Sequence, residues 1–213
     1  MNKVKILLAD DHRIVLEGLK NLLEAEYDIV GMVEDGHMLV KEALRLKPDV
    51  IIADISMPSL NGIDAIRQIQ KEGLTPKVIF LTMHNDALYA KEVLDMGASG
   101  FVLKHSASSE LITAVQEALR GNTHISPAIS QELLQLYQGD KNGRDSTVST
   151  LSLRQREVLQ MLAEGKSAKE IAIVLKISPR TVEFHKYSIM QQLAIKTSAE
   201  LVHFAIKHGM VSI

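Results

Sequence analysis

The first 120 residues alternate short apolar runs with longer amphipathic segments, and this alternation constrains the fold more than any other feature. Five runs are strand-like and mostly apolar at successive positions, as in parallel strands covered on both faces: Val4–Ala9, Ile29–Glu34, Val50–Asp54, Val78–Thr82 and Gly100–Lys104. Helix-period segments lie between and after them, near 14–25, 37–46, 62–72, 86–96 and 108–120. Helices interposed between buried strands predict a doubly wound (βα)5 domain of the α/β class, with strand order 2-1-3-4-5.

The remainder of the chain changes character twice. Ser126–Gln138 predicts a connecting helix, with Ser126 as its cap and Pro127 at its first position, and the polar segment Gly139–Thr147 is typical of a flexible linker. From Leu151 onward the pattern is helical only, with capping-box sequences that begin at Ser152 and Ser167. Four helices are expected, at 153–164, 168–175, 179–193 and 198–208. The predicted domains are residues 1–122 and 151–213, joined by a linker helix and flexible linker at 123–150.

Composition narrows the class of protein. The chain has no Cys, which excludes disulfides, thiolate zinc sites and cysteine nucleophiles. No apolar run approaches the ~20 residues of a membrane-spanning helix, and the N-terminus lacks a signal-peptide pattern, so we expect a cytoplasmic protein without membrane contact. Residues 1–150 carry 15 Lys and Arg against 21 Asp and Glu, whereas residues 151–213 carry 9 against 5. The basic C-terminal part indicates a polyanionic partner.

Three carboxylates stand at the ends of predicted strands. Asp10 and Asp11 follow the first strand and Asp54 ends the third, while Thr82 ends the fourth strand and Lys104 the fifth. In strand order 2-1-3-4-5 the first and third strands are neighbours, and ligands of open parallel sheets bind outside the carboxyl ends of the strands. We therefore expect these five side chains to converge on one crevice.

Packed carboxylates repel one another unless a cation neutralises them, and a hard divalent ion such as Mg²⁺ does so. The set predicts phosphoryl transfer to a carboxylate, with Asp54 as nucleophile, Lys104 pairing with the phosphoryl group and Thr82 donating a hydrogen bond. The alternative for any one of these acids is a helix cap or turn former. Asp49, Asp64 and Asp86 are interpreted in that way.

The predicted helix 179–193 has two contrasting faces. Val182, Ile189 and Leu193 form an inward face, and an unusual polar and aromatic set lies opposite them: Arg180, Glu183, Phe184, Tyr187, Ser188 and Gln191. With the short helix and turn before it, this segment predicts a helix-turn-helix whose second helix enters the major groove.

Side-chain length and chemistry assign roles within this helix-turn-helix. Phe184 is expected to contact a thymine methyl. Four long polar side chains are expected to reach base edges: Arg180, Glu183, Tyr187 and Gln191. Four others are expected to contact phosphates: Lys169, Thr181, His185 and Lys186. His185 has the alternative of a packing role inside the domain.

The residues of the first domain carry a family resemblance. Leu8-Ala9-Asp10-Asp11-His12, Asp54-Ile55-Ser56-Met57-Pro58 with Asn61-Gly62, Leu81-Thr82 and Phe101-Val102-Leu103-Lys104 resemble the receiver domain of two-component response regulators, over about residues 1–122. The resemblance implies phosphorylation of Asp54 by a sensor histidine kinase. It implies Mg²⁺ held by Asp11, Asp54 and the Ser56 carbonyl, with Asp10 acting through water. It also implies that Phe101 is a switch aromatic, in a position where many relatives carry Tyr. A role as an ordinary core residue is the alternative for Phe101.

The last 60 residues resemble a second family. Leu151–Leu159, Gly165–Ala172 and Ser178–His185 are similar to the LuxR-type DNA-binding domain, and the domain order is that of NarL/FixJ-type regulators. The resemblance implies binding to double-stranded DNA as a homodimer when phosphorylated, with dimer contacts on the last helix through Val202 and Ala205. Intradomain packing is the alternative for these two residues. Relatives commonly carry more Lys or Arg in the second half of the recognition helix, where this chain has Tyr187, Gln191 and Gln192.

These features favour a transcription regulator that is switched by phosphorylation and has no turnover beyond self-phosphorylation and self-dephosphorylation on Asp54. One alternative is an aspartyl-nucleophile phosphatase of the haloacid dehalogenase type, but such enzymes carry an acid two residues after the nucleophile, where this chain has Ser56. The other alternative is a DNA-binding regulator that is independent of phosphate and has an inactive receiver.

Overall fold

The computed structural model describes residues 3–83, 87–139, 151–208 and 210–211. The chain divides into two compact units, of which the first holds the elements from β1 to α6 and the second the elements from α7 to α10. The segment expected to be a flexible linker falls largely on residues 140–150, and Asp86 on 84–86; both lie outside the described residues. The domain boundaries given above remain predictions.

The first unit alternates strands and helices as its hydrophobic pattern predicts. The strands are β1 (Lys5–Ala9), β2 (Asp28–Val33), β3 (Val50–Asp54), β4 (Lys77–Thr82), β5 (Gly100–Leu103) and β6 (His124–Ile125). The helices are α1 (Arg13–Leu23), α2 (Gly36–Leu46), α3 (Gly62–Lys71), α4 (Ala87–Asp95), the 3₁₀ turn η1 (Lys104–Ser106), α5 (Ala107–Arg120) and α6 (Pro127–Gly139).

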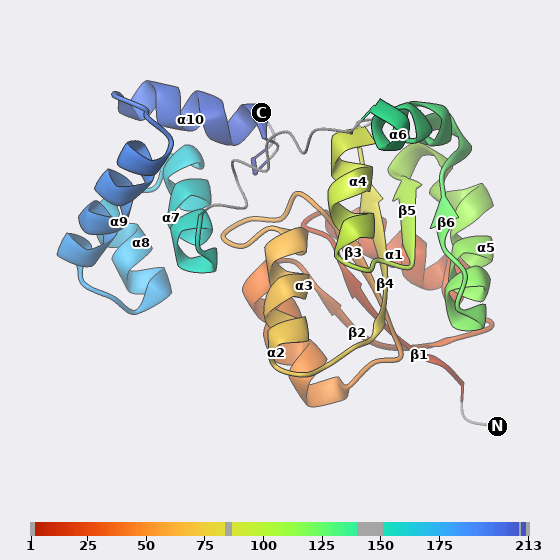
Figure 1. Ribbon diagram of the computed structural model, residues 1–213. Helices are drawn as coiled ribbons and strands as arrows, with labels where there is room; N and C mark the ends of the chain where they lie inside the picture. The colour runs from red at the N-terminus through yellow and green to blue at the C-terminus, as the bar shows by residue number, and fades with distance from the viewer. Residues whose placement is uncertain (1–2, 84–86, 140–150, 209, 212–213) are drawn as a thin grey trace. The chain divides into compact units, whose positions relative to one another are not determined.

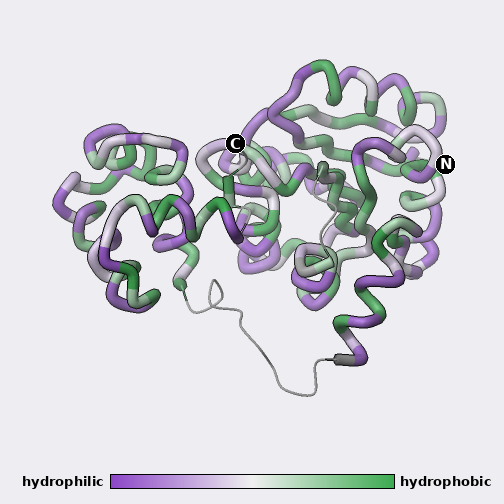
Figure 2. Tube along the Cα trace, turned by 90° about the horizontal axis from the view of Figure 1, so that it is seen from above, coloured by the Kyte–Doolittle hydropathy of each residue, from purple (hydrophilic) through white to green (hydrophobic). Residues whose placement is uncertain are grey.

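The strands form one parallel sheet in the order β2-β1-β3-β4-β5-β6. The predicted order 2-1-3-4-5 is confirmed, and β6 is an addition that the sequence pattern did not indicate. Helices α1 and α5 pack on one face of the sheet, against side chains such as Ile6, Ile52 and Leu81, and α2, α3 and α4 cover the other face (Figure 1). Apolar residues run almost continuously along the strands, whereas the helices alternate apolar and polar positions (Figure 2).

The second unit is the helical domain that the sequence predicts. It consists of α7 (Leu153–Ala163), α8 (Ala168–Leu175), α9 (Pro179–Gln192) and α10 (Ser198–Lys207). Ser152 and Ser167 both form the expected capping boxes, and Ser178 caps α9 ahead of Pro179. A third capping box, at Thr197, begins α10 and was not predicted. One core joins all four helices, and its members include Val158, Ile171, Val182, Ile189 and Leu201.

None of the helices in the described part of the chain combines the length and the apolar character that a bilayer crossing requires.

Candidate functional site

The carboxyl ends of neighbouring strands bring the predicted acidic residues together. Asp10 follows β1 and is fully buried, and Asp54 ends β3 with 4% of its surface exposed. The two strands are paired side by side, with Ala9 opposite Ala53. The Lys104 ammonium, carried in from the end of β5, lies 2.6 Å from Asp10 Oδ2 and 2.8 Å from Asp54 Oδ2. This lysine therefore bridges two carboxylates that would otherwise repel each other.

Burial and charge both act on the protonation of this group. Burial raises the pKa of Asp54 to about 6, against the opposing effect of the Lys104 ammonium. Burial alone would lower the pKa of Lys104, but the Asp54 and Asp10 carboxylates raise it above its usual value. At neutral pH the lysine is charged and Asp54 is mostly ionised, so its carboxylate is available as a nucleophile.

Asp11 and His12 are the exposed members of the acidic cluster. His12 Nδ1 lies 2.8 Å from Asp11 Oδ1, and the His12 backbone N–H donates to Asp10 Oδ1 at 2.9 Å. One ligand atom from each of Asp10, Asp11 and His12 fits within 4.8 Å of the others. Carboxylate oxygens are the donors that Mg²⁺ prefers, so this donor set suits a hard divalent cation. His12 had no predicted role, although its place next to the two acids was a visible signal.

The backbone of the loop after β3 forms a hydrogen bond with the Asp54 side chain. The Ser56 N–H donates to Asp54 Oδ1 at 3.3 Å, and the Gly62 N–H donates to the Ile55 carbonyl at 2.8 Å. A Cβ atom on Gly62 would stand only 2.0 Å from the Asp54 carbonyl oxygen. This close approach therefore requires a glycine at position 62, where the sequence alone shows only a motif residue.

Thr82 and Phe101, the two predicted switch residues, are both fully buried. Thr82 ends β4, the strand next to β3, so it lies at the same edge of the sheet as Asp54. Phe101 stands on β5 opposite Phe80. Their switch roles remain predictions.

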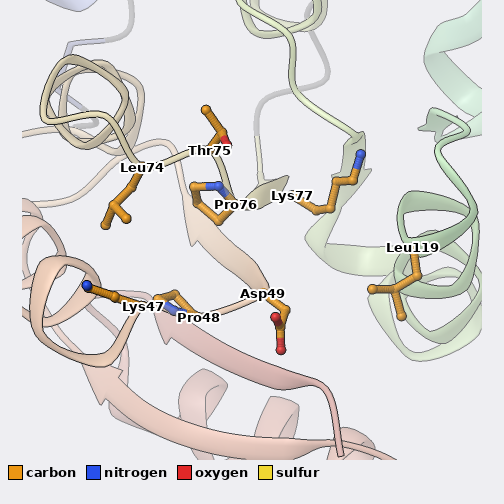
Figure 3. A pocket seen from close by; sticks show the side chains of 8 residues that line it. All are labelled: Lys47, Pro48, Asp49, Leu74, Thr75, Pro76, Lys77 and Leu119. Carbon is orange, nitrogen blue, oxygen red and sulfur yellow. The ribbon is translucent and has the colours of Figure 1, made fainter.

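Asp49 and Asp64, the two described acids that the sequence assigns to structural roles, both have partners within the first unit. The Asp49 side chain accepts the Lys5 backbone N–H, and Asp64 forms an ion pair with Arg67 at 3.0 Å. A shallow pocket of about 390 Å³ at the opposite ends of the strands, near Asp49, contains none of the predicted site residues (Figure 3). Its lining residues are Lys47, Pro48, Asp49, Leu74, Thr75, Pro76, Lys77 and Leu119. The cluster of Asp10, Asp54 and Lys104 therefore remains the candidate for chemistry.

In the second unit, α8 and α9 form the helix-turn-helix. The turn between them passes through Lys176, whose φ of 54° is left-handed, and Ser178 Oγ accepts the Thr181 N–H at 3.1 Å. Val182 and Ile189 are fully buried beneath α9, as predicted, while Phe184 and Tyr187 leave 69% and 63% of their surfaces exposed. Both aromatic side chains are therefore open to a partner, as their predicted role in DNA contact requires.

The predicted DNA contacts differ in how free their side chains are. Lys169, Arg180 and Glu183 are exposed, and Lys186 is partly exposed. The Thr181 hydroxyl is hydrogen-bonded to Ser178 at 2.8 Å. Burial, and then the charge of Arg154, lower the pKa of His185, which favours the neutral form of this histidine. All of these contacts remain predictions.

Ser188 and Ala205 lie in surroundings that differ from those expected from the sequence. Ser188, placed on the outward face of the helix, instead accepts a hydrogen bond from Gln155 of α7 at 3.1 Å, because it faces the neighbouring helix. Ala205, a predicted dimer contact, is fully buried in the core of the second unit, whereas Val202 is partly exposed. Core packing thus accounts for Ala205, and the dimer role of both residues stays a prediction.

Comparison with known proteins agrees with both units. The family described as "Response regulator receiver domain" matches residues 6–116, and "Bacterial regulatory proteins, luxR family" matches residues 149–205. Oxygen regulatory protein NreC of Staphylococcus carnosus is 36% identical over 98% of this chain and 99% of its own length. Transcriptional regulatory protein DegU of Brevibacillus brevis is 33% identical over 100% of this chain and 97% of its own length.

A solved structure of RcsB from Salmonella enterica serovar Typhimurium, bound to promoter P1flhDC with the phosphomimetic BeF₃⁻, is also similar. It has a TM-score of 0.61 and 32% identity, and covers 95% of this chain and 98% of that one. The sequence matches extend over both units in the same order. The chain therefore belongs to the NarL/FixJ-type response regulators, a family of DNA-binding transcription regulators rather than of catalytic enzymes.

Proposed function

We propose that this regulator is switched by transfer of a phosphoryl group from a sensor histidine kinase to Asp54. The observation that carries the proposal is the Lys104 ammonium, which lies 2.6 Å from Asp10 and 2.8 Å from Asp54 at the carboxyl edge of the sheet. An ammonium held there pairs with a phosphoryl group on Asp54 and stabilises the charge that develops during transfer.

In the proposed step, an Asp54 carboxylate oxygen attacks the phosphorus of the phosphohistidine. The new P–O bond forms as the P–N bond breaks, and the imidazole of the kinase leaves with the electron pair and takes up a proton. Mg²⁺, when bound, would neutralise charge on the phosphoryl oxygens. Asp11, Asp54 and the Ser56 carbonyl are the proposed ligands, with Asp10 acting through water.

The proposed output is DNA binding by α9. Phosphorylation would bias the receiver between two states, and Thr82 and Phe101 are the proposed moving parts. The phosphorylated protein would bind double-stranded DNA as a homodimer, with two recognition helices about one helical turn apart. The RcsB structure, which combines promoter DNA with a phosphomimetic, supports this coupling. The proposal places the protein in the cytoplasm, where both partners would meet it.

The test is phosphorylation by phosphoramidate with Mg²⁺, followed by intact mass and by binding of duplex DNA at fixed salt. One added phosphoryl group in the wild type, its absence in Asp54→Ala and tighter DNA binding after modification are expected. Equal DNA affinity and dimerisation in both proteins after the same treatment would instead support the alternative regulator, which does not depend on phosphate.

A further inference from the structure

The chain that follows the receiver match continues the receiver sheet. The family match ends at residue 116, but β6 pairs with β5 in parallel, with Gly100 opposite His124 and Phe101 opposite Ile125. The next residue, Ser126, donates its backbone N–H to the Phe101 carbonyl at 2.9 Å. The segment that leads into α6 is therefore hydrogen-bonded directly to β5. This strand carries Phe101 and ends at Leu103, just before Lys104.

The Ser126 side chain makes a second connection. It is fully buried, and its Oγ accepts the Leu103 backbone N–H at 3.0 Å while donating to Glu110 Oε2 at 2.5 Å. Glu110 Oε2 also lies 3.3 Å from His124 Nε2, so the carboxylate is held from two sides. The hydroxyl thus has both a fixed donor and a fixed acceptor, which defines its direction.

Leu103 is the residue immediately before Lys104, and both of its backbone polar groups are held by serines. Its N–H is bonded to Ser126, and its carbonyl accepts the Ser106 hydroxyl at 3.1 Å. This clamp fixes the point where β5 ends and the 3₁₀ turn η1 begins, which is the point from which Lys104 reaches the two carboxylates. A displacement of about 1 Å in a group that orients a reaction can cost on the order of 10²-fold in rate.

The far end of α6 is attached to α4. Tyr137 OH donates to Asp95 Oδ1 at 3.0 Å, and the Lys91 ammonium lies 5.3 Å from the centre of the Tyr137 ring. Both partners belong to α4, and Ile129 and Leu133 of α6 are buried. Helix α6 is therefore held by β5 where it begins and by α4 near its far end.

We propose that Ser126, a residue of the linker, is a positioning residue for phosphoryl transfer: through the Leu103 N–H it sets the place of Lys104 at Asp54. The inference rests on the proposed function. Because coupling between two sites is reciprocal, a phosphoryl group that shifts Lys104 also changes the hold of Ser126 on the start of α6. The sequence had suggested only a helix cap at this position.

The test compares Ser126→Ala with the wild type and with Ser130→Ala, a matched control on the same helix whose hydroxyl bonds to the Ser126 carbonyl at 3.2 Å. Rates of Asp54 phosphorylation are measured over a range of phosphoramidate concentrations at saturating Mg²⁺, on protein shown by circular dichroism to be folded. We expect Ser126→Ala to lower the maximal rate about tenfold with little change in the half-saturating concentration, because the lysine acts on the transferring group. Ser130→Ala is expected to keep the wild-type rate.

A second variant pair covers the case in which Ser126→Ala fails to fold. Glu110→Gln keeps an acceptor for the Ser126 hydroxyl and should retain most of the rate, whereas Glu110→Ala removes the acceptor and should resemble Ser126→Ala. Hydrogen exchange of residues 127–139 should respond to BeF₃⁻ with Mg²⁺ in the wild type and not in the variants that break the clamp.

The two proposals fail in different ways. Wild-type rates in folded Ser126→Ala and Glu110→Ala would overturn the positioning role and leave the phosphorylation of Asp54 intact. No modification of the wild type would overturn both proposals, since there would be no reaction for Ser126 to support.

Discussion

The dependence of DNA binding on salt tests the assignment of the α8–α9 surface. Two cations are predicted to contact DNA phosphates from each subunit, Lys169 and Lys186. Each phosphate that a protein neutralises releases counterions and contributes about −0.9 to the slope of log K against log salt. A homodimer with four such contacts therefore has an expected slope of about −4, and its affinity falls roughly 10²-fold between 50 and 200 mM salt.

Single substitutions give the sharper measurement. Replacing Lys169 or Lys186 by Ala removes two phosphate contacts from a dimer, so the slope should weaken by about 2. Phe184→Ala should lower affinity at every salt concentration and leave the slope unchanged, because an apolar contact releases no counterions. Lys207→Ala, an exposed lysine at the end of α10, is the matched control and should change neither quantity.

The assay is fluorescence anisotropy of a labelled duplex, titrated with phosphorylated protein at several salt concentrations. A slope that stays the same in both lysine variants, Lys169→Ala and Lys186→Ala, would refute the reasoning. So would a loss of slope in Lys207→Ala equal to theirs, since the contact surface would then lie elsewhere.

Three further predictions concern the receiver. Lys104→Ala should lower the free energy of unfolding by roughly 3 kcal/mol, because two buried carboxylates lose their cation. Mg²⁺ should restore part of this stability in urea titrations, and a variant as stable as the wild type would contradict the prediction. Gly62→Ala should lower stability by about 1–3 kcal/mol and slow phosphorylation, because its Cβ would meet the Asp54 carbonyl at 2.0 Å. Gly18→Ala, in an open part of α1, should instead stabilise by up to about 1 kcal/mol. Burial acts to raise the pKa of Glu110, but hydrogen bonds hold it below its usual value, so its stabilising effect should be present above about pH 4.3 and be lost as the pH falls further. The difference in stability between wild type and Glu110→Gln should shrink over that range, and a constant difference would argue against the shift.

Much of the receiver could be predicted because its signals are local. The apolar runs give the strands to within one or two residues, and the βαβ alternation gives the order 2-1-3-4-5. That order makes β1 and β3 neighbours, so Asp10 and Asp54 had to approach each other. Ser152, Ser167 and Ser178 likewise identified helix starts, because a cap is formed by residues only three apart.

Other features depend on residues that are far apart in the chain. β6 has only two residues and acquires its identity from pairing with β5, so its own sequence carries no strand period. Ser188 was expected to face outward, and only the packing of α7 against α9 brings Gln155 to it. Helical spacing alone cannot show which neighbouring helix contacts a residue at the border between the buried and the exposed face.

The sequence by itself determined the two domain types, the acidic residues at the sheet edge and the helix-turn-helix, because each is written in consecutive or regularly spaced residues. The tertiary structure decided that one ammonium, on Lys104, serves both Asp10 and Asp54, and that the hydroxyl of Ser126 holds the strand end before it. Those contacts depend on the distances between side chains of different strands, and these distances are set only when the sheet has formed and its register is fixed.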